Sequence, residues 1–160
     1  MMKHRIVKSE DIFVVGLSAE ANFQNISRVT PQLAKQFMPR LGEISNRKDD
    51  YTLSLQNYKH FDFSKFNPTE TFEKWIGVEV LHLDDVPQGM QSLTINVGNY
   101  LVIDFKGSIP DFIKHWKYIH STWLPNSEFE LDNRPHFERL PPSYSPMNEV
   151  NAEEIWIPIK

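Results

Sequence analysis

Residues 151–160 read NAEEIWIPIK, and their side chains alternate in character along the chain. Successive side chains of a β-strand point to opposite faces, so Ile155 and the two isoleucines at alternate positions after it would form one apolar face. Glu154 and Trp156 would point the other way. A carboxylate beside a large aromatic ring suits a pocket for an apolar or cationic small molecule. The alternative is a surface edge strand with a solvated glutamate.

The length and composition indicate a single globular domain over residues 1–160. A chain of 160 residues can bury a substantial core, and 40% hydrophobic with 24% charged residues is typical of a folded protein. The net charge is −4 and the chain has no basic run, which argues against direct nucleic-acid binding through an electrostatic footprint. No helix-turn-helix pattern is apparent either.

The absence of cysteine excludes disulfides, thiol catalysis and cysteine-ligated metals. The N-terminal sequence MMKHRIVKSED lacks the apolar core of a signal peptide, and no apolar run approaches the roughly 20 residues of a membrane-spanning helix. The chain also has no glycine-rich phosphate loop, no nucleophile elbow and no pair of histidines at metal-ligand spacing. We therefore expect a cytoplasmic protein with no membrane partner, metal or cofactor.

The first half of the chain, about residues 1–85, is predicted to run strand, helix, strand, strand. The predicted strands are residues 12–17 (IFVVGL), 51–57 (YTLSLQN) and 73–83 (EKWIGVEVLHL). The helix is expected to start at Thr30-Pro31, because a capping residue before proline is typical of a helix N-terminus. Pro39 should kink or break this helix. The phenylalanines of residues 59–71 should fold back onto the body.

The second half, about residues 86–160, repeats this order. It contains a strand region at 93–105 interrupted by Gly98-Asn99, a helix entered through Ser108 and Asp111, a strand at 129–140 and the final strand. Identity between the halves is negligible, so the repeat is inferred from element order. We predict an α+β domain with pseudo-two-fold symmetry, in which two helices cover one face of an antiparallel sheet and a ligand cleft lies on the other.

Strand parity groups the candidate site residues. Glu138 alternates with Phe137, and if each core face is the aliphatic one, Glu138 and Glu154 share the other face with Trp75 and Trp156. Two carboxylates among aromatic rings could hold a cation, or could act as general base and acid if their pKa values differ. The alternative is two exposed glutamates paired with neighbouring basic side chains. That alternative would use the three candidates Arg134, Arg139 and Lys160.

Weaker candidates for the pocket are Trp123, which precedes Leu-Pro at the helix end, and the tyrosines Tyr51 and Tyr118. Trp123 could equally pack in the core, and packing is the simpler interpretation of the two tyrosines.

Six short motifs, in order, resemble the GyrI-like effector-binding family, also known as the AraC-type effector-binding domain. The motifs are Trp75-Ile76-Gly77-Val78-Glu79-Val80, Val86-Pro87-Gln88-Gly89, Gly98-Asn99-Tyr100, Trp123-Leu124-Pro125, Pro135-His136-Phe137-Glu138 and Glu154-Ile155-Trp156-Ile157-Pro158-Ile159. The resemblance covers about residues 7–160. It implies a duplicated strand-helix-strand-strand (SHS2-like) fold with a cleft that binds lipophilic, often cationic, molecules.

The resemblance also implies roles for particular residues. The two pocket carboxylates of the family fall on Glu138 and Glu154, and the pocket aromatics fall on Trp156 and Trp75. Leu140 stands where family members often have a pocket tyrosine, and Trp75 replaces a commoner tyrosine. These departures concern the ligand rather than the fold.

Three functions follow as hypotheses. The first is a stand-alone protein that binds a hydrophobic, possibly cationic, small molecule and serves a drug-sensing, sequestering or transcription-effector role. The second is a hydrolase of small electrophilic compounds, with Glu154 as general base, because some relatives have such an activity. The third is a module that modulates gyrase or another protein partner, which the net charge of −4 supports only slightly.

Overall fold

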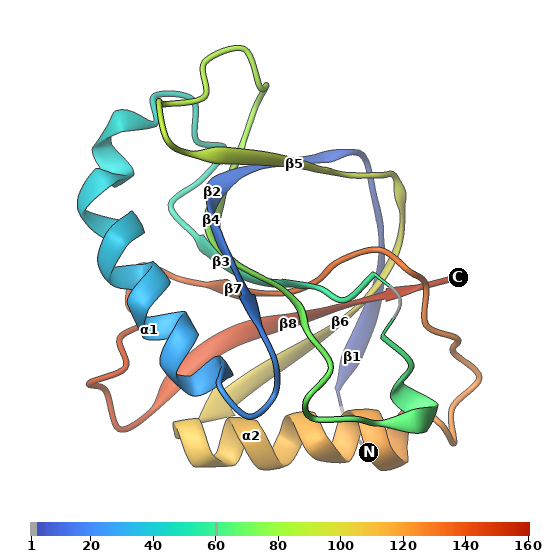
Figure 1. Ribbon diagram of the computed structural model, residues 1–160. Coiled ribbons are helices and arrows are strands. Elements are labelled where there is room, and N and C mark those ends of the chain that lie inside the picture. The colour runs from blue at the N-terminus through green and yellow to red at the C-terminus, as the bar shows by residue number, and fades with distance from the viewer. Residues whose placement is uncertain (1–2, 60) are drawn as a thin grey trace.

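Over the residues that the structure describes, the fold consists of one antiparallel sheet of eight strands and two main helices, which confirms the predicted α+β class. The computed structural model describes residues 3–59 and 61–160 (Figure 1). The strands are β1 (His4–Ser9), β2 (Ile12–Ala21), β3 (Thr52–Asn57), β4 (Phe72–Val80), β5 (Gln91–Ile95), β6 (Gly98–Gly107), β7 (His136–Leu140) and β8 (Asn151–Ile159). The helices are α1 (Ile26–Phe37) and α2 (Ile109–Tyr118), and neither has the length and apolar character to cross a membrane.

The strand order is symmetric about the centre of the sheet. It runs β1-β6-β8-β7-β3-β4-β2-β5, so β3 and β7 are central neighbours, and β4 and β8 lie outside them. The outermost strands are exchanged between the halves, because β1 pairs with β6 and β5 pairs with β2. Each half thus contributes strand, strand, helix, strand, strand, which is one strand more than the repeat predicted from the sequence.

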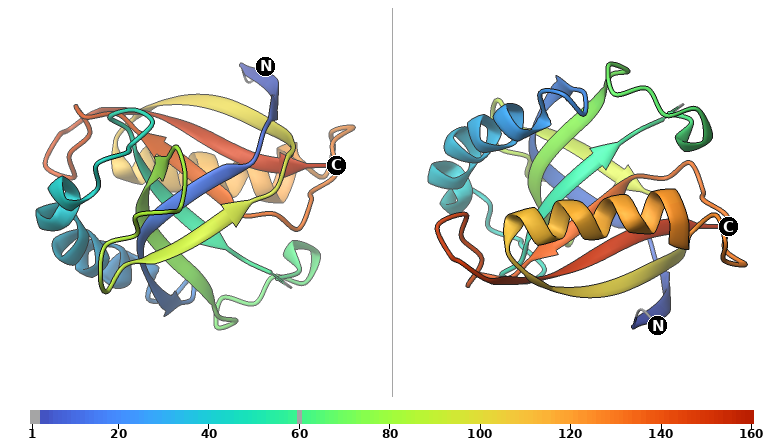
Figure 2. Two further views of the ribbon diagram at one scale, coloured as in Figure 1. Left: turned by 90° about the horizontal axis from the view of Figure 1, so that it is seen from above. Right: turned by 90° about the horizontal axis from the view of Figure 1, so that it is seen from below.

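The sheet bends until its two edges approach each other. Only two residues join β1 to β2, although these strands stand at opposite ends of the strand order, and the link from β5 to β6 is equally short. The two links are tied together, since the backbone N–H of Val97 donates to the carboxylate of Asp11 at 2.8 Å. Figure 2 shows the strands wrapping around a common interior, with both helices outside it.

Register distinguishes the two faces of the sheet. On the face toward the helices, one row across five strands runs through Ile76, Ser54, Glu138, Ile155 and Ile103. Two apolar clusters lie on this face, one under α1 and one under α2. The next row, on the opposite face, runs through Trp75, Leu55, Phe137, Trp156 and Val102. A third apolar cluster fills this inner face, so its centre is a packed core rather than an open cleft.

The helix boundaries have local causes. α1 begins at Ile26, earlier than predicted, where the side chain of Asn22 accepts hydrogen bonds from the N–H groups of Gln24 and Asn25 at 2.9 Å. Pro39 does end the α-helix, which passes at Met38 into a 3₁₀ turn. The predicted capping box of α2 is present, since Ser108 and Asp111 bond each other's backbone N–H.

The strand predicted at residues 129–140 is shorter in the structure. Only β7 (His136–Leu140) forms a continuous strand. Before it, Leu131 makes an isolated bridge with Ile159, and the side chains of Asp132 and Ser127 accept hydrogen bonds from backbone N–H groups in the neighbouring bends. Of the phenylalanines that follow β3, Phe61 and Phe63 pack against the cluster under α1 as expected, whereas Phe66 is 51% exposed.

Candidate functional site

The two predicted pocket carboxylates lie on opposite faces of the sheet. Glu138 is in register with Ile155, and Arg139 is in register with Glu154. Glu138 therefore faces the helices, while Glu154 and Trp156 face the inner side together with Trp75. The prediction that Glu138 shares a face with these three residues is wrong. Trp156 is in register with Phe137, so Phe137 lies on the inner face of β7 and the next residue, Glu138, lies on the helix face.

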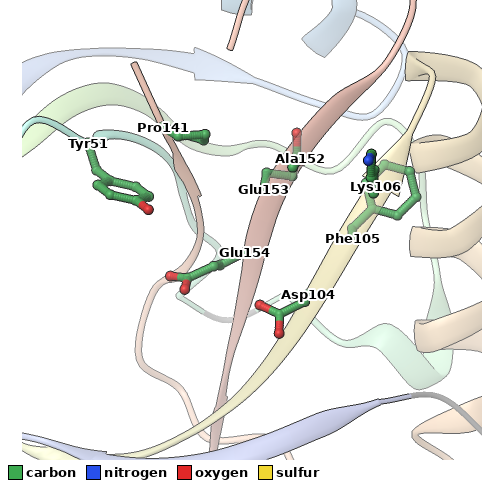
Figure 3. A pocket seen from close by; sticks show the side chains of 8 residues that line it. All are labelled: Tyr51, Asp104, Phe105, Lys106, Pro141, Ala152, Glu153 and Glu154. Atoms are coloured by element: carbon green, nitrogen blue, oxygen red, sulfur yellow. The ribbon is translucent and has the colours of Figure 1, made fainter. Parts of the chain in front are cut away.

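A hollow of about 350 Å³ lies beside Glu154, at the point where β7 separates from β8. The β7–β8 pairing covers only three residues of each strand, so residues 151–153 of β8 pair with β6 and not with β7. The hollow is lined by Tyr51, Asp104, Phe105, Lys106, Pro141, Ala152, Glu153 and Glu154. Figure 3 shows the carboxylates of Glu154 and Asp104 turned to the same side, with Tyr51 facing them.

Glu154 is held between two arginines. Its Oε1 accepts from Nη1 of Arg139 at 2.6 Å, and its Oε2 accepts from Nη2 of Arg5 at 2.9 Å. Arg5 also donates to Asp104 at 2.9 Å, and Arg139 donates to Asp49 at 2.8 Å. The alternative drawn from the sequence, an ion pair between a glutamate and Arg139, is thus present, although Glu154 is a lining residue of the hollow as well.

Aromatic rings complete this network. The Arg139 guanidinium carbon lies 4.1 Å from the centroid of the Tyr51 ring and 6.0 Å from that of Trp156. Trp156 donates its indole N–H to Glu154 at 3.1 Å and stacks on Phe137 with ring centroids 5.2 Å apart. Trp75 lies deeper on the same face, 4% exposed, and belongs to the packed inner cluster.

A buried polar group lies on the helix face around Glu138. Glu138 is 7% exposed and accepts from the side-chain amide of Gln56 at 3.3 Å, while Lys74 is 1% exposed and donates to the hydroxyl of Ser54 at 2.5 Å. Burial raises the pKa of Glu138 to about 7 against the opposing charge of Lys74. Burial likewise lowers the pKa of Lys74 to about 8, with the charges of Glu138 and Glu153 opposing that change.

Glu153 connects the hollow to this buried group. It lines the hollow, yet its pKa is raised to about 8 by burial and by the charge of Glu138, while Lys74 acts in the opposite direction. The two adjacent glutamates of β8 therefore lie in different electrostatic surroundings. Glu153 keeps its proton near neutral pH, whereas Glu154 makes two ion pairs.

The weaker candidates for pocket residues lie in different parts of the structure. Tyr51 lines the hollow. Leu140 lies on the helix face, two residues beyond Glu138. Trp123 packs in the cluster under α2, with its ring 5.2 Å from His4. Tyr118 is 49% exposed on the outer surface at the end of α2. None of these last three residues lines the hollow.

Five acidic or basic residues of the site were not singled out from the sequence as pocket residues, and four of them lie on the paired strands β1, β6, β7 and β8. They are Arg5, Asp49, Asp104, Arg139 and Glu153. Within residues 3–59 and 61–160, no group of three histidine, aspartate or glutamate side chains could hold a metal ion. The site consists of ion pairs and aromatic rings.

Comparison with solved structures shows the same fold in several proteins. The structure of SAV2435 bound to tetraphenylphosphonium matches with a TM-score of 0.74 at 15% identity, covering 99% of this chain and 94% of that chain. The C-terminal domain of EcmrR matches with a TM-score of 0.63 at 12% identity, covering 100% and 98%. A hydrolase from Listeria innocua matches with a TM-score of 0.56 at 9% identity, covering 99% and 92%.

No curated protein matches the chain in sequence. The family model of the GyrI-like small molecule binding domain matches residues 2–160, which is nearly the whole chain. The chain belongs to the GyrI-like small-molecule-binding domain family.

Proposed function

We propose that the chain binds a hydrophobic cation in the hollow beside Glu154. The observation that carries this proposal is that Tyr51 and Glu154, which line the hollow, already contact a cation. The Arg139 guanidinium lies over the Tyr51 ring and bonds both Glu154 and Asp49. Carboxylates and an aromatic face together attract a cation, and an apolar body gains from burial against the rings. A volume of about 350 Å³ falls within the range of small-molecule sites.

The bound relative supports this class of ligand. Tetraphenylphosphonium, the ligand of SAV2435, is a hydrophobic cation with four aromatic rings. EcmrR forms a complex with DNA, and the likeness of this chain to its C-terminal domain supports a transcription-effector role. A sequestering role would use the same site.

The test is a calorimetric titration of the wild-type protein with tetraphenylphosphonium and with a neutral aromatic molecule of similar size. Glu154→Gln should weaken binding of the cation by about tenfold, equivalent to 1.4 kcal/mol, and should change binding of the neutral molecule much less. Glu149→Gln, at an exposed position that does not line the hollow, is the control for loss of one negative charge. Equal losses for both ligands would contradict the electrostatic part of the proposal.

A second candidate function is hydrolysis of a small electrophilic compound. The observation that favours it is the adjacency of Glu153 and Glu154 on one hollow, where Glu153 keeps its proton because burial raises its pKa to about 8. A protonated and an ionised carboxyl in one site could serve as general acid and general base. Mass spectrometry of an excess of compound incubated with the protein distinguishes the candidates: turnover supports the hydrolase, and a stoichiometric complex without product supports the binder.

A further inference from the structure

The position of the Arg139 guanidinium is defined by four neighbours. Its Nη1 lies 2.6 Å from Glu154, its Nη2 lies 2.8 Å from Asp49, and its central carbon lies 4.1 Å from the centroid of the Tyr51 ring and 6.0 Å from that of Trp156. The side chain is 20% exposed. Burial opposes the charge, but the hydrogen bonds and charges of Glu154 and Asp49 prevail and raise the pKa of Arg139. Arg139 is therefore a permanent cation at this place.

The arrangement suits a planar, forked cation better than a compact one. Two carboxylates accept hydrogen bonds from two different nitrogens of one flat group, and the central carbon of that group lies over an aromatic ring. A guanidinium or amidinium can meet these partners at once, whereas an ammonium is a point charge with no flat face to stack. The geometry around Arg139 is thus selective for shape as well as for charge.

We propose that this position is a binding site for guanidinium and amidinium compounds, and that the Arg139 side chain is its resident occupant. An aryl-amidine or aryl-guanidine binds by displacing Arg139 and places its ring in the hollow, which Tyr51 and Glu154 line next to the guanidinium. This inference rests on the proposed function for the location of the ring. Because Arg139 is tethered to β7, it competes at high effective concentration and lowers the affinity for added cations.

Removal of the resident cation tests the proposal. Arg139→Ala vacates the position, while Glu154 retains its ion pair with Arg5 at 2.9 Å, so the site keeps one of its two arginines. Arg28→Ala, which removes an exposed arginine from α1, is the matched control. The probes are benzamidine, benzylammonium and benzamide, which share a phenyl ring and differ in the polar group. Dissociation constants come from isothermal titration calorimetry.

We expect Arg139→Ala to bind benzamidine at least about tenfold more tightly than the wild type and the Arg28→Ala control do. The same variant should prefer benzamidine to benzylammonium by a similar factor and should bind benzamide weakly. Benzamidine affinity that is unchanged by Arg139→Ala, or that equals the affinity for benzylammonium, would overturn the proposal.

The proposed function is assessed separately with tetraphenylphosphonium. Binding of that cation by the wild type, without a benzamidine preference in Arg139→Ala, defeats the present inference alone. If Arg139→Ala prefers benzamidine but the wild type does not bind tetraphenylphosphonium, the proposed binding of a bulky hydrophobic cation is contradicted and the present inference stands. If Arg139→Ala does not fold, ¹⁵N NMR of the wild-type protein decides: benzamidine should shift the side-chain Nε–Hε resonance of Arg139, and binding that leaves this resonance unchanged overturns the proposal.

Discussion

Glu138 and Glu154 lie on the neighbouring strands β7 and β8 and point to opposite faces of the sheet. Glu138 is in register with Ile155 and is buried beneath the helices beside Gln56. Glu154 is paired with Arg139 and lines the hollow on the other side. Mutation of Glu138 should therefore change the charge balance of the interior, whereas mutation of Glu154 should change the binding of ligand.

Glu138→Gln is expected to lower the pKa of Lys74 further below about 8. Burial already lowers the pKa of this amine, and the negative charge of Glu138 is the first of the two charges that counteract the effect. Replacing that charge by a neutral amide leaves Glu153 as the remaining counteracting group. The measurement is a pH titration of the Lys74 side-chain ¹³Cε or ¹⁵Nζ resonance. Glu154→Gln is the matched control on the other face, and a Lys74 pKa that both variants change equally would contradict the assignment of Glu138.

Glu153→Gln should alter how the free energy of unfolding depends on pH. The pKa of Glu153 is raised from 4.5 to about 8 in the folded protein, so the folded state binds this proton more tightly than the unfolded chain does. Its contribution to stability is fully present below pH 4.5 and is lost as the pH rises toward about 8. Glutamine does not titrate, so the variant should gain stability relative to the wild type over this range.

The gain should amount to a few kcal/mol, since each unit of pKa difference corresponds to about 1.4 kcal/mol and part of the side chain is accessible to solvent. Urea unfolding at a series of pH values from about 5 to 8 measures it. Glu149→Gln, at an exposed position, should follow the wild type at every pH. A stability difference between Glu153→Gln and the wild type that stays constant with pH would show that Glu153 does not retain its proton.

Local patterns in the sequence were sufficient to predict most strands. The alternation within residues 151–160 predicted β8, because the period of two depends on neighbouring residues and requires no knowledge of the partner strand. The capping pair Ser108 and Asp111 predicted the start of α2 for the same reason. β1 was not predicted as a separate strand, since its short charged sequence has little local signal and its pairing with β6 brings together residues about 100 positions apart.

The placement of Glu138 shows where such patterns fail. Parity assigned it to the inner face on the assumption that aliphatic residues mark the core side of every strand. On β7 the helix side carries His136 and Glu138, whose polar neighbours come from β3 and β4. The face of one strand relative to the next is set by register, which a single strand's composition does not reveal. The ion pairs of Arg139 with Glu154 and Asp49 depend on the same long-range pairing.

Gly16→Ala should destabilise the protein through the pairing of β2 with β4. Gly16 and Gly77 are opposite each other, and a Cβ on Gly16 would collide with the carbonyl oxygen of Ile76 and lie 2.6 Å from the Cα of Gly77. Such overpacking typically costs about 1–3 kcal/mol, and a backbone collision leaves little room for relief. Gly42→Ala is the control, because its Cβ would meet nothing within 4 Å. Urea unfolding should show a loss at Gly16 alone, and equal effects at both positions would contradict the close approach.

Tyr51 and Arg139 should show a measurable coupling in a double-mutant cycle on protein stability. The guanidinium carbon lies 4.1 Å from the ring centroid, and the contact is partly shielded from water. Cation–π pairs of this kind are worth about 0.5–2 kcal/mol. In the cycle of Tyr51→Leu and Arg139→Met, the double variant should lose less than the sum of the single losses by about that amount. Tyr51→Phe should keep the coupling, because the ring face and not the hydroxyl contacts Arg139. Additive losses for Tyr51→Leu and Arg139→Met would mean that the ring only packs against the arginine stem. They would contradict the proposed attraction between the Tyr51 ring and a cation.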